Sequence, residues 1–467
     1  MNETEYLIVG AGPTGLGAAT RLHERGGDWH LVEAAPGFGG LAATFVDPEG
    51  FTWDQGGHVQ FSHYETFDRY MDAALGADGW LSHQRESWCL VRGKWVPYPF
   101  QNNLHRLDPA DRWACVQGLL QAHEQARVAA GGRPEHFEAW MRATFGPGIT
   151  DLFMRPYNFK VWAHPPATMD YGWIGERVAV PKLEGVLKSL CTGEDAVSWG
   201  PNALFRFPRN GGTGSVWTAI GRGLPAERVT LGDAVEHIDV AARQVRTRSG
   251  RTFRYRRLIS TLPLNHLIRL APGVVPAEAA ERLVYSSTHV VGFGLAGQPP
   301  EHLRTKCWMY FPEANSPYYR VTVFSNYSPH NVPQPGRQWS LMTETAQSAA
   351  KPVDHEQLVA WTERALVEDG LIPDPAAICS RAHYHLAQGY PTPFRGRDAV
   401  VDPLLRAFEA KGLFSRGRFG AWKYEVANQD HSFAQGYECV ERLRADGGPE
   451  LEPTLHTPSV VDARRNP

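Results

Sequence analysis

The sequence predicts an α/β fold in which a helical domain and an antiparallel β-sheet domain are inserted into a Rossmann-like domain. Three observations lead to this prediction. A strand, a Gly-rich turn, a helix and a second strand open the chain over residues 6–34, residues 104–163 are typical of helices, and residues 285–344 carry strand-like runs. A chain of 467 residues is long enough for two or three domains, since domains average about 150 residues.

The opening unit predicts a dinucleotide-binding turn. The run YLIVGAG from Tyr6 indicates a buried strand that ends in a Gly turn, PTGLGAATRLHER a helix, and WHLVEA a second strand. Gly10, Gly12 and Gly15 form the pattern GxGxxG between strand and helix, and Glu33 lies where the ribose-binding acid of such units belongs. The alternative is a tight turn that only packs the helix against the sheet.

Further elements follow along the chain. Two more Gly-rich segments are PGFGGLAATF at 36–45 and WDQGGHVQFSH at 53–63. Helical character is clearest in WACVQGLLQAHEQA, and strands are indicated by HVVGFGLAG, CWMYFP, YYRVTVFSNY and QWSLMTE. The segments FPRNGGTGSVWTAIGRGL, VEHIDV and RLISTLPL predict a Gly turn, a helix and strands between these regions. The segment GRFGAWKYEVANQDHS at 417–432 precedes a helix predicted to start near His431, whose free N–H groups would favour an anion.

The composition argues against several classes of protein. Hydrophobic residues make up 42% of the chain and charged residues 21%, as in a globular protein, and the net charge of −3 gives no basic footprint for nucleic acid. The six cysteines contain no CxxC pair, so we expect neither a metal site nor a disulfide framework. No apolar run approaches the ~20 residues of a membrane span. Glu3 and Glu5 stand where a secretion signal would carry bases. We therefore expect a cytoplasmic protein without a membrane partner.

Specific strings point to a family. The paired Gly-rich turns resemble the FAD-binding domains of amine oxidases and glutathione reductase-like proteins. More particular strings resemble the UDP-galactopyranose mutases of the eukaryotic, fungal-like type, in order and over nearly the whole chain: FMRPYNFKVWA, GERVAVP, WGPNALFRFP, YSSTHVVG, CWMYFPE, YRVTVFSNYS, GYPTP and GRFGAWKYEVANQDHS.

The resemblance implies a division into three domains. A discontinuous FAD-binding domain would comprise residues 1–83, 200–286 and 384–467. Residues 104–199 would form the helical domain with a substrate flap, and residues 84–103 and 287–383 the antiparallel sheet domain. Gly and Pro punctuate residues 174–182 and 198–204, which we expect to act as two mobile flaps that close over the substrate.

The resemblance also implies an activity. The family's flavin-dependent isomerases interconvert the pyranose and furanose forms of UDP-galactose through a covalent adduct between flavin N5 and sugar C1, with reduced FAD, NAD(P)H as reductant and no net redox change. Three alternatives stay open. They are the same chemistry on another nucleotide-sugar, a net-redox FAD oxidase of the amine oxidase type, and a non-catalytic flavin or nucleotide-sugar binding protein. The oligomeric state, homo-oligomer or monomer, is not indicated by the sequence.

Residues carried over from the family form four sets. His58, Arg177, Arg320 and Arg418 are expected to be catalytic, with Arg177 and Arg320 on the diphosphate, because the planar guanidinium bonds phosphate oxygens bidentately. The substrate set is Tyr98, Phe100, Gln101, Phe153, Tyr157, Asn158 and Trp162 around uracil, and Asn202, Trp308, Tyr310, Tyr327, Tyr390 and Tyr424 around the sugar and diphosphate. The flavin set is Gly10, Gly12, Gly15, Glu33, Gly39, Gly40, Leu41, Gly57, His58, Val235, Arg418, Gly420, Asn428, Gln429 and Ser432. His63 and Arg85 are expected to assist nicotinamide binding. The alternative for the aromatic residues is a place in the core, and for an arginine an ion pair at the surface.

Overall fold

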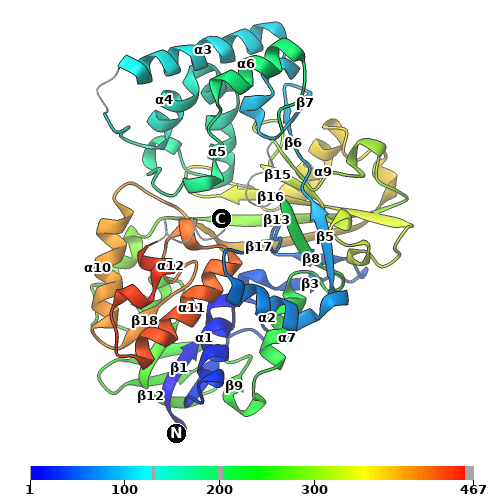
Figure 1. Cartoon of the computed structure of the whole chain (residues 1–467). Coiled ribbons are helices and arrows are strands. Elements are labelled where there is room, and N and C mark those ends of the chain that lie inside the picture. Colours follow the sequence, from blue (N-terminus) through cyan, green and yellow to red (C-terminus); the bar gives the residue numbers. More distant parts are fainter. Residues whose placement is uncertain (1, 129–131, 198–202, 458–467) are drawn as a thin grey trace.

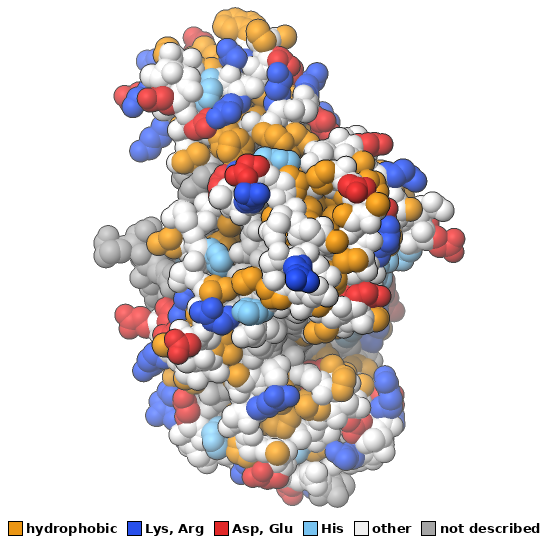
Figure 2. All heavy atoms as spheres, turned by 90° about the vertical axis from the view of Figure 1, so that its right-hand side faces the viewer, with side chains coloured by type: hydrophobic (Ala, Val, Ile, Leu, Met, Phe, Trp, Pro, Cys, Tyr) orange, Lys and Arg blue, Asp and Glu red, His pale blue; other side chains and the backbone are white. Residues whose placement is uncertain are grey.

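The computed structural model describes residues 2–128, 132–197 and 203–457. It consists of three stacked parts, with a group of helices at the top of Figure 1, an antiparallel sheet across the middle and a mainly parallel sheet with its helices below. None of the helices in the described part of the chain combines the length and apolarity that a membrane crossing requires. Basic and acidic side chains intermingle on the face shown in Figure 2.

The lower sheet forms the Rossmann-like part. Its strand order is β10-β11-β12-β1-β2-β9, with β18 also paired to β12. The strands are β1 (Asn2–Val9), β2 (Trp29–Val32), β9 (Val229–Thr230), β10 (Val235–Asp239), β11 (Gln244–Thr247), β12 (Thr252–Ser260) and β18 (Leu413–Ser415). Strands β1, β2, β9, β12 and β18 pair in parallel, whereas β10 and β11 extend the sheet by antiparallel pairing. Three distant segments of the chain thus build one sheet.

Helices from both ends of the chain cover this sheet. Helix α1 (Pro13–Glu24) packs along α11 (Gln429–Arg444), and the two lie side by side in Figure 1. We expected a C-terminal helix to start near His431. It starts two residues earlier, at Gln429, with Asn428 as the N-cap residue. The remaining helices of the lower part are α2 (Glu65–Leu75), α7 (Gly214–Arg222), α8 (Leu264–Leu270), α10 (Arg397–Glu409) and α12 (Pro453–His456).

The middle sheet has the order β17-β13-β16-β15-β14-β6-β7. The strands are β6 (Ser87–Val91), β7 (Lys94–Pro97), β13 (Tyr285–Ala296), β14 (Trp308–Tyr310), β15 (Arg320–Val323), β16 (Gln338–Gln347) and β17 (Ile378–Pro391). All neighbours are antiparallel except β6 and β14. Helix α9 (Leu358–Glu368) packs on one face through a core that includes Val291, Phe293 and Leu366. The opposite face meets Phe51 and Trp53 of the lower part.

One predicted domain boundary falls inside a strand. β17 pairs with β13 as far as Pro391, so residues 384–391, which we assigned to the flavin domain, belong to the middle sheet. The strand continues past residue 384 because β13 offers pairing partners as far as Tyr285. The rest of the division into three domains stays a prediction.

The upper helices are α3 (Pro109–Val128), α4 (Phe137–Ile149), α5 (Arg155–Trp162) and α6 (Leu183–Thr192). They share a core with β6 and β7, in which Phe100, Phe145 and Trp162 are buried. Two small strand pairs, β3 (Thr44–Val46) with β4 (Thr52–Asp54) and β5 (Trp80–Gln84) with β8 (Leu204–Pro208), complete the described strands.

Candidate active site

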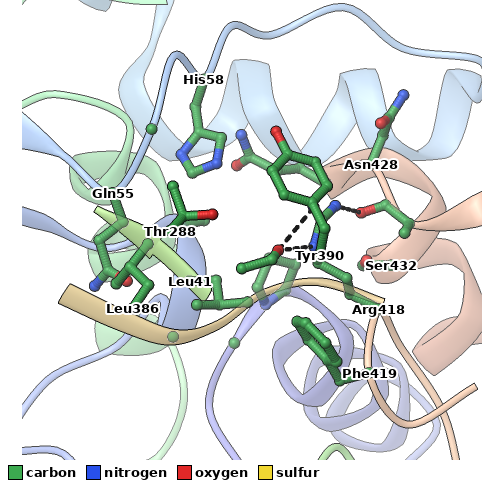
Figure 3. A pocket seen from close by; sticks show the side chains of 18 of the residues that line it. Leu41, Gln55, His58, Thr288, Leu386, Tyr390, Arg418, Phe419, Asn428 and Ser432 are labelled. Carbon is green, nitrogen blue, oxygen red and sulfur yellow. Dashed lines mark hydrogen bonds between the residues drawn. The ribbon is translucent and has the colours of Figure 1, made fainter. Parts of the chain in front are cut away.

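A cavity of about 740 Å³ is lined by residues of all three parts of the molecule. Its lining from the lower part includes Gly10 and residues 12–14, 40–42, 55–59, 261–263, 417–419 and 427–430. The middle sheet contributes 385–390 together with Thr288, Trp308, Tyr310, Arg320 and Glu344, and Arg177 comes from the segment between α5 and α6. Figure 3 shows His58 and Thr288 on one side of this cavity, and Tyr390, Arg418 and Asn428 on the other. Segments hundreds of residues apart therefore meet at one space.

The three glycines of the first turn have three different structural roles. Gly10 has φ of +106°, and a Cβ there would lie 2.0 Å from Thr261 Oγ1. A Cβ on Gly15 would lie 1.8 Å from the Gly10 carbonyl oxygen, so Gly15 allows α1 to pack against the turn. By contrast, a Cβ on Gly12 would come no closer than 3.7 Å to another part of the protein. Gly12 lines the cavity, so its missing side chain leaves room for a ligand at the N-terminus of α1.

Glu33 is held by the same turn. Its carboxylate accepts hydrogen bonds from the Ala11 N–H at 2.6 Å and from the Ala35 N–H at 2.7 Å, and it lines the cavity. The acid at the end of β2 thus faces the same space as the open glycine, as the spacing predicted.

The N-terminus of α11 also points into the cavity. Asn428 is the N-cap residue, but its side chain makes no capping hydrogen bond. Gln429 is fixed instead by side chains, because its Oε1 accepts from Trp217 Nε1 at 2.6 Å and from Gln60 Nε2 at 3.0 Å. Asn428, Gln429 and Ser432 all line the cavity. The amide of Asn428 is therefore available to a ligand rather than needed by the helix.

His63 lies away from the cavity wall. His63 is buried. Its backbone N–H donates to Asp430 Oδ2 at 2.9 Å, and its ring Nδ1 hydrogen-bonds the same oxygen at 2.7 Å. The structure thus uses His63 to anchor the start of α11, and its expected contact with a nicotinamide stays a prediction.

Buried polar atoms of the cavity without a hydrogen-bond partner among the described residues include His58 Nδ1 and Thr288 Oγ1. A buried polar group left unpaired costs about 1–3 kcal/mol. Burial lowers the pKa of His58 to about 4, so its ring is neutral near pH 7. These atoms, the open Gly12 and two helix N-termini fit a large polar ligand such as FAD.

Arg320 is held by a carboxylate that sequence reasoning missed. Arg320 and Glu344 lie opposite each other on β15 and β16, and the guanidinium Nε and Nη2 each donate to Glu344 at 2.7 Å. Glu344 also accepts from the Gly57 N–H at 2.9 Å and from the Tyr319 hydroxyl at 2.8 Å. Burial opposes its ionisation, but Arg320 and these donors hold the pKa of Glu344 below its usual value. The available signal was a lone acid inside the apolar strand run QWSLMTE.

Two further arginines converge on the same space. Arg177, in a short 3₁₀ turn at Gly175–Arg177, donates from Nη2 to the Glu425 carbonyl at 2.5 Å. Arg418 donates to the Gly389 carbonyl at 3.1 and 3.2 Å and to the Ala427 carbonyl at 3.1 Å, as the dashed lines of Figure 3 show. Carbonyl partners orient these guanidinium groups without neutralising their charge.

Tyrosine rings lie between these arginines. The Arg418 guanidinium lies 4.7 Å from the centre of the Tyr390 ring, and that of Arg177 lies 5.8 Å from the Tyr424 ring. Both tyrosines line the cavity. The predicted diphosphate residues Arg177, Arg320, Tyr390 and Tyr424 therefore share one wall, which can bind an anion.

Arg85 lies among three of the predicted substrate residues. Its guanidinium is 4.5 Å from the rings of both Tyr98 and Trp308, and its Nη2 donates to the Tyr310 hydroxyl at 3.0 Å. All four residues line the cavity. Tyr98, predicted for uracil, thus lies beside Trp308 and Tyr310, predicted for the sugar pocket. Arg85, which we expected to assist nicotinamide binding, contacts all three.

The other predicted substrate residues do not line the cavity. Phe100 and Phe153 stack at 4.6 Å inside the upper core. Five more predicted substrate residues are absent from the cavity lining: Gln101, Tyr157, Asn158, Trp162 and Tyr327. Four residues of the predicted flavin set are absent from it as well: Gly15, Gly39, Val235 and Gly420. Their binding roles stay predictions. Asn202 and part of the second predicted flap lie outside the described residues.

Comparison with known proteins places this site in a family. The profile of the flavin containing amine oxidoreductases matches residues 13–415. A crystal structure of reduced UDP-galactopyranose mutase is 46% identical, with a TM-score of 0.94, over 98% of this chain and 99% of that one. The chain belongs to the UDP-galactopyranose mutase family.

More distant structures share the fold of this mutase family. A protoporphyrinogen oxidase from Exiguobacterium sp. 255-15 is 17% identical at a TM-score of 0.70, over 95% of this chain and 99% of that one. Cyclohexylamine oxidase from Brevibacterium oxydans is 15% identical at a TM-score of 0.65, with the same coverage. A zeta-carotene desaturase from Zea mays is 38% identical over 74 residues, which is 16% of this chain and 13% of the desaturase.

Proposed function

We propose that this protein is a flavin-dependent mutase that interconverts UDP-galactopyranose and UDP-galactofuranose without net redox change. One observation carries the proposal. Arg177, Arg320 and Arg418, from three distant segments, line the same cavity as the glycine turn of a dinucleotide site. The 46% identity with a UDP-galactopyranose mutase over nearly the whole chain supports this assignment.

The residues of the lower part would hold FAD. The open Gly12 and the N-terminus of α1 suit its pyrophosphate, Glu33 suits a ribose, and His58, Arg418 and Asn428 would lie near the ring. Reduced flavin, when bound, supplies a nucleophile for the anomeric carbon of the sugar. The neutral His58 ring beside it adds no competing charge.

The arginine wall would bind the diphosphate and retain UDP during the reaction. Hydrogen bonds to charged groups are shorter and stronger than neutral ones, and a guanidinium can offer two of them in parallel. Glu344 occupies Nε and Nη2 of Arg320, so Nη1 is the nitrogen that makes no hydrogen bond within the described residues. Glu344 would therefore aim Arg320, and Tyr390 and Tyr424 would add hydroxyl donors.

The segment at 174–182 would close over the bound substrate. Arg177 is held there by the Glu425 carbonyl, and the Ala179 carbonyl accepts from Gln101 Nε2 at 2.5 Å. Two hydrogen bonds outside regular elements can be exchanged for contacts with a diphosphate, as the closure of a lid requires. NAD(P)H is the reductant that we propose for the resting flavin.

A net-redox FAD oxidase is the competing function. Its support is the fold alone, because the oxidases are only 15–17% identical. Incubation with UDP-galactopyranose under dithionite, followed by chromatography of the nucleotide-sugars, separates the two. We expect UDP-galactofuranose at a constant ratio to the pyranose. Oxygen consumption driven by a substrate amine, without any isomerised sugar, would contradict the proposal.

A further inference from the structure

Four histidines gather on the middle sheet, on the face that α9 covers. His289 lies on β13, His383 and His385 lie on β17, and His355 lies in the segment between β16 and α9. His289 and His385 are directly opposite in the strand register, and His383 is two residues away on the same face. One ring nitrogen each from His289, His355 and His385 lies within 4.8 Å of the other two.

Hydrogen bonds orient the central ring. His289 Nε2 lies 2.6 Å from Gln347 Oε1, and since an amide oxygen only accepts, Nε2 carries the proton. The other nitrogen, Nδ1, is then an acceptor, and it accepts from His383 Nε2 at 2.9 Å, a hydrogen bond that a metal bound at Nδ1 would replace. Gln347 Oε1 also accepts from His355 Nε2 at 2.8 Å. A histidine that binds a metal usually donates its second N–H to such an oxygen, which fixes the ring and its tautomer. Gln347 thus occupies the place of an outer partner.

The rings are packed against each other rather than into apolar surroundings. His289 is fully buried, and its ring centre lies 4.5 Å from that of His385 and 4.5 Å from that of His355. His355 and His385 are exposed. Ring nitrogens of His289, His355 and His385 therefore lie around one small space.

We propose that His289, His355 and His385 bind one divalent transition metal of the Zn²⁺ type, with His383 beside it. Zn–N bonds of about 2.0–2.1 Å in tetrahedral geometry place ligand nitrogens roughly 3.3 Å apart, so small rotations of the exposed rings close the site. Mg²⁺ and Ca²⁺ prefer oxygen ligands, and the three-histidine set offers none. The metal would tie β13, β17 and the segment before α9 together at the edge of the cavity, which His385 lines.

The sequence alone does not indicate this site. The ligands come from three segments that are far apart, and the only local sign is the pair of histidines in HYH at 383–385. We expected no metal site because the sequence has no CxxC pair. A short sequence motif does not reveal this cluster, because strand pairing places His289 opposite His385.

The test uses flavin-loaded full-length protein without an affinity tag, stripped of metal by a chelator. Zn²⁺ is titrated calorimetrically, and Co²⁺ is added separately so that its visible absorption reports the ligand geometry. We expect one Zn²⁺ per chain. His355→Gln and His385→Gln should each weaken binding about tenfold or more and remove the Co²⁺ bands. His330→Gln, an exposed histidine outside the cluster, should bind like the wild type.

Because His355 and His385 are exposed, both variants should fold like the wild type, and flavin content and far-ultraviolet circular dichroism check this directly. Addition of Mg²⁺ in place of Zn²⁺ should give no saturable heat. Absence of saturable Zn²⁺ binding in the wild type would overturn the proposal. Equal Zn²⁺ affinity in His355→Gln, His385→Gln and His330→Gln would overturn it as well, because the metal would then lie elsewhere.

Discussion

The glycine turn and the arginine wall face the same cavity, but they are built in different ways. At the turn, backbone geometry makes the site, since Gly10 needs a positive φ and Gly12 needs an empty side-chain position. At the wall, side chains from three segments converge, and strand register places Arg320 opposite Glu344. A backbone site can be recognised from a short stretch of sequence, whereas a side-chain site depends on how distant strands pair.

The largest expected effect is at the turn. Gly12→Val should abolish flavin binding, because the new side chain occupies the space in front of α1, yet the protein should fold, since nothing of the chain lies within 3.7 Å of the new Cβ. Gly37→Val, at a position with open surroundings, is the matched control. Flavin absorbance per chain and circular dichroism measure both. A yellow Gly12→Val variant with full flavin occupancy would refute this view of the turn.

At the arginine wall we expect smaller, graded losses. Arg177→Ala and Arg320→Ala should each raise the Kd for UDP about ten- to hundred-fold, since a hydrogen bond to a charged group contributes about 1.5–3 kcal/mol. Lys at either position should restore only part of the UDP affinity, because an ammonium group lacks the planar pair of donors that a guanidinium offers. Arg269→Ala, which breaks an exposed ion pair, is the control. If calorimetry finds unchanged UDP affinity in both Ala variants, the diphosphate binds elsewhere.

Glu344 tests whether the wall is one unit. Glu344→Ala leaves Arg320 without its buried partner and should cost about 3 kcal/mol of unfolding free energy. The double variant Glu344→Ala/Arg320→Ala should lose less than the sum of the single losses, by about 1 kcal/mol or more. Urea unfolding of the four proteins gives this coupling. Strictly additive losses would mean that Glu344 does not position Arg320.

The flap should show the smallest change. Amide hydrogens in residues 174–182 should exchange more slowly in the reduced enzyme when UDP is added, because Arg177 then orders the segment on the ligand. Mass spectrometry of hydrogen exchange measures this, with 264–270 in α8 as an internal control. Equal exchange with and without UDP, at a concentration where UDP binds, would show that Arg177 acts from a preformed site.

These two regions also explain how much the sequence could predict. The first βαβ unit, the strand-rich region, the helical insertion and the residues Gly12, Glu33 and Arg418 all follow from local pattern or family strings. The partner of Arg320 could not be predicted, because Glu344 lies 24 residues away and meets it only through antiparallel pairing. The same limit separates the aromatic residues: Tyr98 and Phe100 are two residues apart, yet Tyr98 lines the cavity and Phe100 packs in the upper core.

The central claim is that the cavity supports isomerisation with reduced flavin and no net redox change. The most direct measurement counts UDP-galactofuranose formed per NADPH oxidised under strictly anaerobic conditions, beside an identical sample with fully oxidised FAD. The account predicts many product molecules for each NADPH consumed and no product in the oxidised sample. One NADPH oxidised per product molecule, or turnover with oxidised FAD, would contradict it.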